Sequence, residues 1–161
     1  MKRLLSLLVV MVIPFLAIPR ASAEKPTITR SVIDVESLVR DQCSFPVIVH
    51  QTGVVIDIIT TDEDGTVHDL EAFPRGRAVL TNVRNGHTLD INIAGPGKLT
   101  FFEDGSFTLD GTGPWIFWPF PGTDEPGIFQ TLGHFLLTVD PEGNVTFTLT
   151  GHVEDLCAQL A

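Results

Sequence analysis

From Cys43 to the C-terminus, short runs rich in Val, Ile, Thr and Phe alternate with clusters of Gly, Pro, Asn and Asp. These turn clusters recur roughly every ten residues, which is typical of an all-β sandwich or barrel. No window after Cys43 has the apolar spacing of an amphipathic helix. The pattern predicts strands over residues 46–60, 66–72, 77–83, 87–94, 97–102, 106–111, 128–139 and 144–153.

The register of one hairpin follows from its side chains. A tight turn with Gly105 in the left-handed conformation pairs Phe101 with Phe107. The same ladder sets Lys98 opposite Asp110, so apolar residues face each other and a cation faces an anion. A slip by one residue would mix the two faces.

A second hairpin has the same type of turn, with Gly143 in the left-handed position. It pairs Val139 with Val145 and, further along, Gly133 with Gly151. Successive hairpins of this kind predict a single antiparallel meander of about eight strands. We expect it to form a closed or nearly closed barrel, since closure removes exposed strand edges, with a two-sheet β-sandwich as the alternative.

The first 23 residues have the order of a secretory signal peptide. Lys2 and Arg3 precede an apolar run over 4–18, and Ala21-Ser22-Ala23 supplies small residues for the peptidase. The run is shorter than the ~20 residues that span a bilayer. We expect cleavage after Ala23, a secreted extracellular protein with no membrane anchor, an N-terminal arm over 24–42 that is extended or a short helix, and a β domain over 43–161.

The charge excludes some partners. The chain has 20 Asp and Glu against 10 Lys and Arg, and three of the cations lie before Glu24. So acidic a protein repels phosphate backbones and anionic headgroups, which argues against binding to nucleic acid or to a membrane surface.

Two cysteines bracket the β domain. Cys43 precedes the first apolar run and Cys157 lies near the C-terminus. In an oxidising compartment the simplest interpretation is a disulfide between them, and two free thiols are the alternative.

Four segments resemble a family of small secreted proteins of unknown function from high-GC Gram-positive bacteria: Cys43-Ser44-Phe45-Pro46-Val47, Gly111 to Trp118, Asp124 to Ile128, and Asp155 to Leu160. The resemblance covers most of the chain from Cys43 onward, and its paired cysteine ends are the most specific part. It implies export, one β domain and the disulfide. It implies no catalytic residue.

Aromatic residues concentrate in one stretch rich in Pro and Gly, where Trp115, Phe117, Trp118 and Phe120 stand close together. Rings on a stiff backbone suit sugars or apolar ligands, so these four residues are candidates for a ligand-binding face. The alternative is that they belong to the core. We expect Trp115 and Trp118 to point to different faces, with Trp118 buried and Trp115 partly exposed.

An acidic segment partly matches a calcium loop. With Thr60 as first position, Asp62, Asp64 and Glu71 fall where such a loop places carboxylate ligands. However, the first ligand is Thr, and the preceding residues predict a strand where a helix is required. An acidic hairpin tip is the alternative.

A second candidate metal site follows from the register of the second hairpin. It places His134 and His152 diagonally on one face, with Glu154 further along. Two imidazoles and a carboxylate are possible zinc or iron ligands. The same face carries several Thr residues, so a solvated sheet surface is the alternative.

Motifs for catalysis and for cofactors are absent. The sequence has no Gly-x-Ser-x-Gly, no His-Glu-x-x-His and no phosphate-binding or dinucleotide-binding glycine loop, so we expect no cofactor. Asp57 with Glu71 is a conceivable acid and base pair, but so acidic a chain produces such pairs by chance. We therefore expect an extracellular module that binds an unknown ligand or protein. The alternative is a small extracellular enzyme, an isomerase or hydrolase, with its site in the mouth of a barrel.

Overall fold

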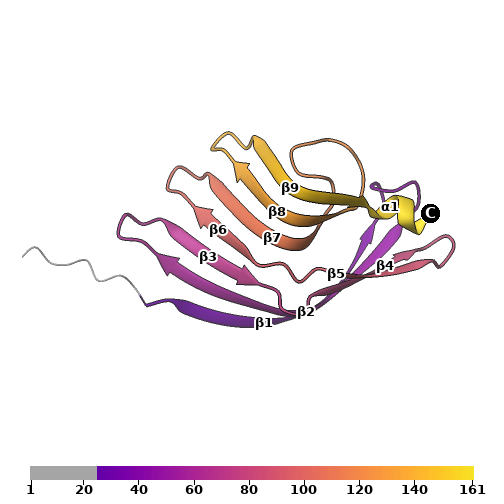
Figure 1. Cartoon of the computed structure of the whole chain (residues 1–161), viewed down its shortest axis with the longest axis horizontal. Helices are drawn as coiled ribbons and strands as arrows, with labels where there is room; N and C mark the ends of the chain where they lie inside the picture. The colour runs from indigo at the N-terminus through magenta and orange to yellow at the C-terminus, as the bar shows by residue number, and fades with distance from the viewer. Residues whose placement is uncertain (1–24) are drawn as a thin grey trace, which may run out of the picture.

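The computed structural model describes residues 25–161, so the expected signal peptide lies outside the described residues. These residues form an all-β protein with one short helix at its C-terminus (Figure 1). The elements are β1 (Thr27–Val39), β2 (Val47–Thr61), β3 (Val67–Ala72), β4 (Arg77–Asn82), β5 (Thr88–Asn92), β6 (Gly97–Phe101), β7 (Phe107–Phe117), β8 (Phe129–Val139), β9 (Val145–Asp155) and α1 (Leu156–Leu160).

The nine strands form one antiparallel sheet in the order β5-β4-β2-β3-β6-β7-β8-β9, and β1 pairs with the other edge of β2. Strand β2 has two partners on one edge: Val47–Thr52 pairs with β4, and Ile56–Thr61 pairs with β3. Gly53 lies between these halves at φ 149°, and a Cβ there would lie 2.6 Å from the ring of Phe73. A glycine is therefore needed where β2 passes from one partner to the other.

The sheet is open, so the closed barrel predicted from the pattern is not formed. Within the described residues, β1, β5 and β9 each pair on one side only. In Figure 1 the sheet curls from β1 at the bottom to β9 at the top, with α1 at one end. The ends of the domain are joined there by the predicted Cys43–Cys157 disulfide, with Cα atoms 5.5 Å apart. A helix and a covalent bond hold the ends together where a barrel would have a strand pair.

Both predicted hairpin registers are confirmed. Strands β6 and β7 pair Phe101 with Phe107 and Lys98 with Asp110. Strands β8 and β9 follow the second register from the turn to Gly133, which pairs with Gly151. The side-chain pattern and a left-handed glycine are sufficient here, because the paired residues are close in sequence.

The arm over 24–42 is extended and not helical, since it contains a 13-residue strand, β1, that pairs with β2 along its whole length. Two other elements differ from the sequence expectation. Strand β7 continues to Phe117, so most of the aromatic stretch is strand and not loop. The helix α1 was not predicted, because five residues are too few to show a helical period; its N-cap is Asp155, which accepts a hydrogen bond from the backbone N–H of Ala158 at 3.1 Å.

The hydrophobic side chains form two clusters. The fully buried one lies between β2, β4, α1 and the start of β8, and contains Val39, Phe45, Val47, Val49, Ala78, Leu80, Ile93, Ile128, Leu156 and Leu160. The other is an aromatic cluster on the inner face of β7–β9, made of Trp115, Phe117, Phe120, Phe129, Phe135 and Phe147, whose ring centroids are 5.0 to 6.4 Å apart. The candidate site lies on this inner face.

Candidate functional site

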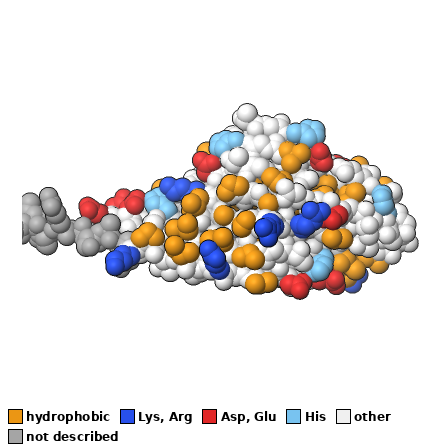
Figure 2. All heavy atoms as spheres, turned by 60° about the horizontal axis from the view of Figure 1, so that its bottom comes forward, with side chains coloured by type: hydrophobic (Ala, Val, Ile, Leu, Met, Phe, Trp, Pro, Cys, Tyr) orange, Lys and Arg blue, Asp and Glu red, His pale blue; other side chains and the backbone are white. Residues whose placement is uncertain are grey.

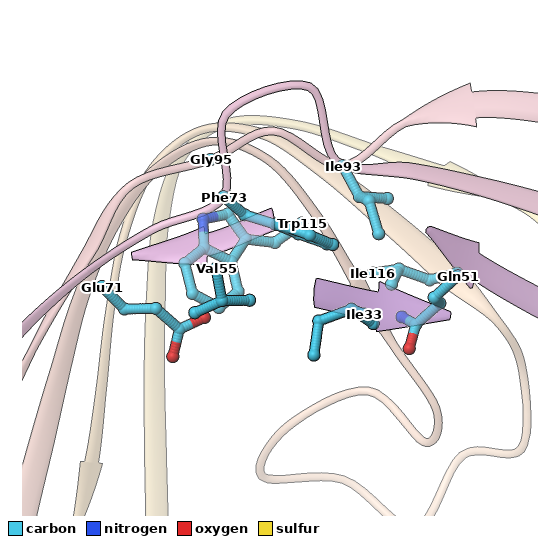
Figure 3. Close-up of a pocket in the computed structure, with 9 residues that line it drawn as sticks. All are labelled: Ile33, Gln51, Val55, Glu71, Phe73, Ile93, Gly95, Trp115 and Ile116. Atoms are coloured by element: carbon cyan, nitrogen blue, oxygen red, sulfur yellow. The ribbon is translucent and has the colours of Figure 1, made fainter. Parts of the chain in front are cut away.

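A cavity of about 270 Å³ lies on the inner face of the sheet (Figure 3). Residues from β1, β2, β3 and β7 line it together with the connections on either side of β4 and β5. They are Ile33, Gln51, Val55, Glu71, Phe73, Ile93, Gly95, Trp115 and Ile116. Most of this lining is apolar, and the amide of Gln51 and the carboxylate of Glu71 are its polar side chains, as is typical of sites for small molecules.

Two glycines hold Trp115 in place at this cavity. A Cβ at Gly95 would overlap its indole ring, and one at Gly97 would lie 2.7 Å from it. The ring of Phe135 packs edge-on against it, with centroids 5.4 Å apart. The indole Nε1 is covered and has no hydrogen-bond partner among the described residues. The N–H of this ring is therefore not accessible to a ligand in the cavity.

Three carboxylates lie on the part of the inner face formed by β2 and β3. Glu71 pairs directly with Asp57, and Asp69 lies two residues before Glu71 on the same face. Asp57 accepts a hydrogen bond from Thr29 Oγ1 at 2.9 Å. None of the three forms a salt bridge within residues 25–161. The inner face therefore holds negative charge without a compensating cation.

The position of these carboxylates changes their acidity. Burial raises the pKa of Glu71 above its ordinary value, and the nearby charges of Asp57 and Asp69 raise it further. Burial also raises the pKa of Asp69, with Asp57 as the second cause. One oxygen of Asp69 is buried without a partner among the described residues. Such carboxylates favour either a bound proton or a bound cation.

The four aromatic ligand candidates do not form one face. Trp115 lines the cavity, whereas Phe117 and Phe120 belong to the aromatic cluster. Trp118 packs against the fully buried cluster. Both tryptophans are half-buried, and they lie in different clusters. The structure therefore separates Trp115, at a cavity, from Trp118, which supports the core.

The calcium-loop residues are divided between two faces of the sheet. Asp62 Oδ2 lies 2.8 Å from His68 Nε2, and Asp64 accepts a hydrogen bond from the backbone N–H of Thr66 at 3.0 Å. Glu71 lies on the inner face, and His68 lies on the outer face of the same strand. The turn is a hairpin tip, and Glu71 does not share a site with Asp62 and Asp64.

The residues of the second metal candidate lie on the outer face and are mostly exposed. His134 and His152 are diagonal neighbours, as predicted. His134 Nε2 lies 2.8 Å from Asp110 Oδ1, whereas His152 Nε2 lies 3.8 Å from Glu154 Oε1. Among residues 25–161, no three His, Cys, Asp or Glu side chains are grouped so that they could hold a metal ion.

The sequence indicates both Trp115 and Glu71 as site candidates, but in two separate sites and not in one cavity. A signal for part of the site was available in the turn over 62–66: extending its ladder sets Asp57 opposite Glu71, among inward-facing hydrophobic residues. Like charges opposite each other on a half-buried face cost stability, which marks an unusual position. The contact with Trp115 joins distant strands, and no local pattern reports it.

Comparison of the chain with protein-family models, with curated proteins and with solved structures finds no match. In the part of the chain that the structure describes, no helix has the length and apolar character needed to cross a membrane.

Proposed function

We propose that this protein is an extracellular binding module, and that its cavity takes a small molecule with an apolar body and a cationic group. The observation that supports this most is the cavity itself, which places the ring of Trp115 and the carboxylate of Glu71 in one lining. Export is supported by the signal-like segment before Glu24 and by the disulfide, since such bonds persist in oxidising compartments.

The cationic group follows from the charges on the inner face. A half-buried carboxylate without a counter-ion is costly, and Asp57 and Asp69 add repulsion to Glu71. A ligand cation relieves this cost and also gains from an aromatic ring face, which contributes about 0.5–2 kcal/mol. An anionic ligand meets only repulsion. The remaining lining offers hydrophobic contact from residues such as Ile33 and Val55 to the apolar part of the ligand.

Binding can be tested with benzyltrimethylammonium and with its neutral analogue, in which carbon replaces the charged nitrogen. We expect the cation to bind about tenfold more tightly than the analogue and to change the tryptophan fluorescence. Glu71→Gln should reduce the preference for the cation, because Asp57, Asp69 and the Trp115 ring remain, whereas Glu103→Gln, at an exposed turn, should leave it unchanged. Equal affinity of the unaltered protein for both compounds would refute the cationic ligand.

The chain has two tryptophans, so replacing each in turn assigns the fluorescence change to one ring. The signal from the ligand should persist in Trp118→Phe and disappear in Trp115→Phe. A signal that disappears in Trp118→Phe alone would place the ligand outside this cavity.

The raised pKa of Glu71 favours a second candidate, a small hydrolase that uses this carboxylate as general acid or base. Its site would be the cavity, since the sheet has no barrel mouth. Chromogenic 4-nitrophenyl glycosides and esters are suitable probes. An enzyme should release 4-nitrophenol with a pH profile set by Glu71, and Glu71→Gln should abolish the release. No release from the unaltered protein, together with binding of the cation, would leave the binding module.

A further inference from the structure

Among residues 25–161, strand β1 leaves one edge of the sheet unpaired. It pairs with β2 on one side only and is the longest of the edge strands in the described residues. Its side chains include the two most exposed large hydrophobic residues of that region, Val32 at 80% and Ile28 at 63%. Figure 2, with the lower side of Figure 1 turned forward, shows hydrophobic side chains interspersed with Lys and Arg on this outer face.

Such an edge normally carries protection against pairing. Natural edge strands are kept short, or carry charged side chains, bulges, prolines or inward-pointing charges. Strand β1 carries charges of both signs, so they repel a like-charged strand and not a complementary one. Strand β5 is short, at five residues. Strand β1 has 13 residues that pair with β2 without interruption, and the exposed Val32 lies next to its central residue, Ile33. This edge is therefore suited to receive another strand.

The charges of β1 are complementary to those of a second, antiparallel β1. Its even-numbered residues lie on the outer face, because Ile33 lines the cavity on the inner face. If two copies pair about a twofold axis through Val32, Arg30 of each copy lies opposite Asp34 of the other. The register therefore places opposite charges together twice, with Val32 against Val32 at the centre.

The side chain of Asp34 is available for this contact. It lies 2.7 Å from His50 Nε2 and is nevertheless 76% exposed. A register shifted by two residues, with the axis through Asp34, would set Asp34 against Asp34, and one with the axis through Arg30 would set Arg30 against Arg30. A register with the axis through Ile33 would pair Arg30 with Glu36 and set Val32 against Asp34. The axis through Val32 is the register that pairs Arg30 with an acid and keeps Val32 against an apolar residue.

We propose that two copies of this chain form a symmetric dimer by antiparallel pairing of their β1 strands about Val32, with reciprocal Arg30–Asp34 contacts. The dimer extends the sheet of each copy across the twofold axis. It also sets Ser31 of the second copy beside Ile33, at the wall of the cavity. The proposal rests on the edge strand and its charges, so it stands or fails separately from the ligand.

Charge exchange between the two positions provides the test. The dimer contains two equivalent contacts between residue 30 of one copy and residue 34 of the other. R30E alone places two acidic side chains at each contact, and D34R alone places two cationic side chains there. Each variant should therefore sediment as a monomer at concentrations where the unaltered protein sediments as a dimer. An equimolar mixture of R30E and D34R should restore the dimer, since both contacts then join opposite charges.

The outcomes separate the possibilities. A monomeric unaltered protein at all concentrations, or single variants that dimerise as well as it does, would overturn the proposal. Rescue of R30E by E36R and not by D34R would overturn the register. Circular dichroism establishes that each variant is folded.

A cross-link provides a second measurement that does not depend on the charged variants. In the proposed register V32C places the two Cβ atoms of residue 32 about 4.5–5.5 Å apart across the axis. Residue 28, which is also exposed, lies opposite Glu36 of the second copy, so the two I28C side chains are far from each other. Mild oxidation should cross-link V32C much faster than I28C. Equal rates would contradict pairing about Val32.

Discussion

Glu71 is the residue at which stability and binding make opposite demands. Its carboxylate lines a cavity, opposite Asp57 and close to Asp69, and burial is the main cause of its raised pKa. A raised pKa means that the folded protein binds this proton more tightly than the unfolded chain does. The free energy of unfolding therefore decreases as pH rises through a window that begins near the ordinary value of 4.5 and ends at the raised pKa.

Glu71→Gln should remove this contribution to the pH dependence. Relative to the unaltered protein, the variant should gain stability as pH rises through the window and keep that gain above it, because the amide needs no charge. Urea unfolding from about pH 4 to 8 measures the difference. Glu103→Gln, at an exposed turn, is the matched control. A stability difference that does not vary with pH would show that the carboxylate is not perturbed by its surroundings.

At the scale of elements, α1 occupies the place where a barrel would have its closing strand pair. Its residues Leu156 and Leu160 are fully buried. The backbone N–H of Leu156 donates to Ile128 O at 2.9 Å, and Leu160 O accepts from Asn82 Nδ2 at 2.9 Å. One turn of helix thereby joins the start of β8 to the end of β4.

Substitutions in and beside α1 should reflect this role. Leu160→Ala should cost about 2–5 kcal/mol of stability, since it opens a cavity in the buried cluster. Asp155→Ala should cost about 1 kcal/mol through loss of the N-cap. Gln159→Ala, an exposed position, should stay within about 0.5 kcal/mol. Denaturant unfolding measures the stability of all three variants. Equal losses of stability at positions 159 and 160 would contradict the role of α1 in the buried cluster.

At the scale of the whole molecule, the domain is held together by side-chain packing and one covalent bond, without a continuous ring of strand pairs. The disulfide joins the connection between β1 and β2 to α1 across a sequence separation of 114 residues. A bond that closes so long a loop restricts the unfolded chain strongly.

Removal of this bond should lower stability by about 2–5 kcal/mol. The variant with both Cys43→Ala and Cys157→Ala avoids a free thiol, and its denaturant midpoint can be compared with that of the unaltered protein. Reduced unaltered protein should behave like the double variant. An unchanged midpoint would mean that the two ends of the domain are not coupled through the disulfide.

Much of the local structure was predictable. The strands after Cys43 and the two hairpin registers follow from alternation and turn glycines. The site was predictable only in part. The sequence indicates Trp115 as a ligand-binding residue because of its aromatic neighbours. It indicates Glu71 as a ligand in a calcium loop, which the structure does not form. Their common cavity depends on Gly95 and Gly97 lying beneath the indole ring, which is a contact between segments far apart in the chain.

The amino-acid sequence by itself determined the all-β class, the hairpins and the pairing of the cysteines, because these depend on neighbouring residues or on the choice of a single partner. Tertiary structure alone decided that the sheet stays open. That outcome depends on β2 accepting both β4 and β3 on one edge at Gly53, and on packing of α1 against the buried cluster. Such pairings between distant segments are selected by the total burial of the whole chain, and no local pattern specifies them. The same packing created the cavity, on which the proposed ligand depends, and left β1 at an edge, on which the proposed dimer depends.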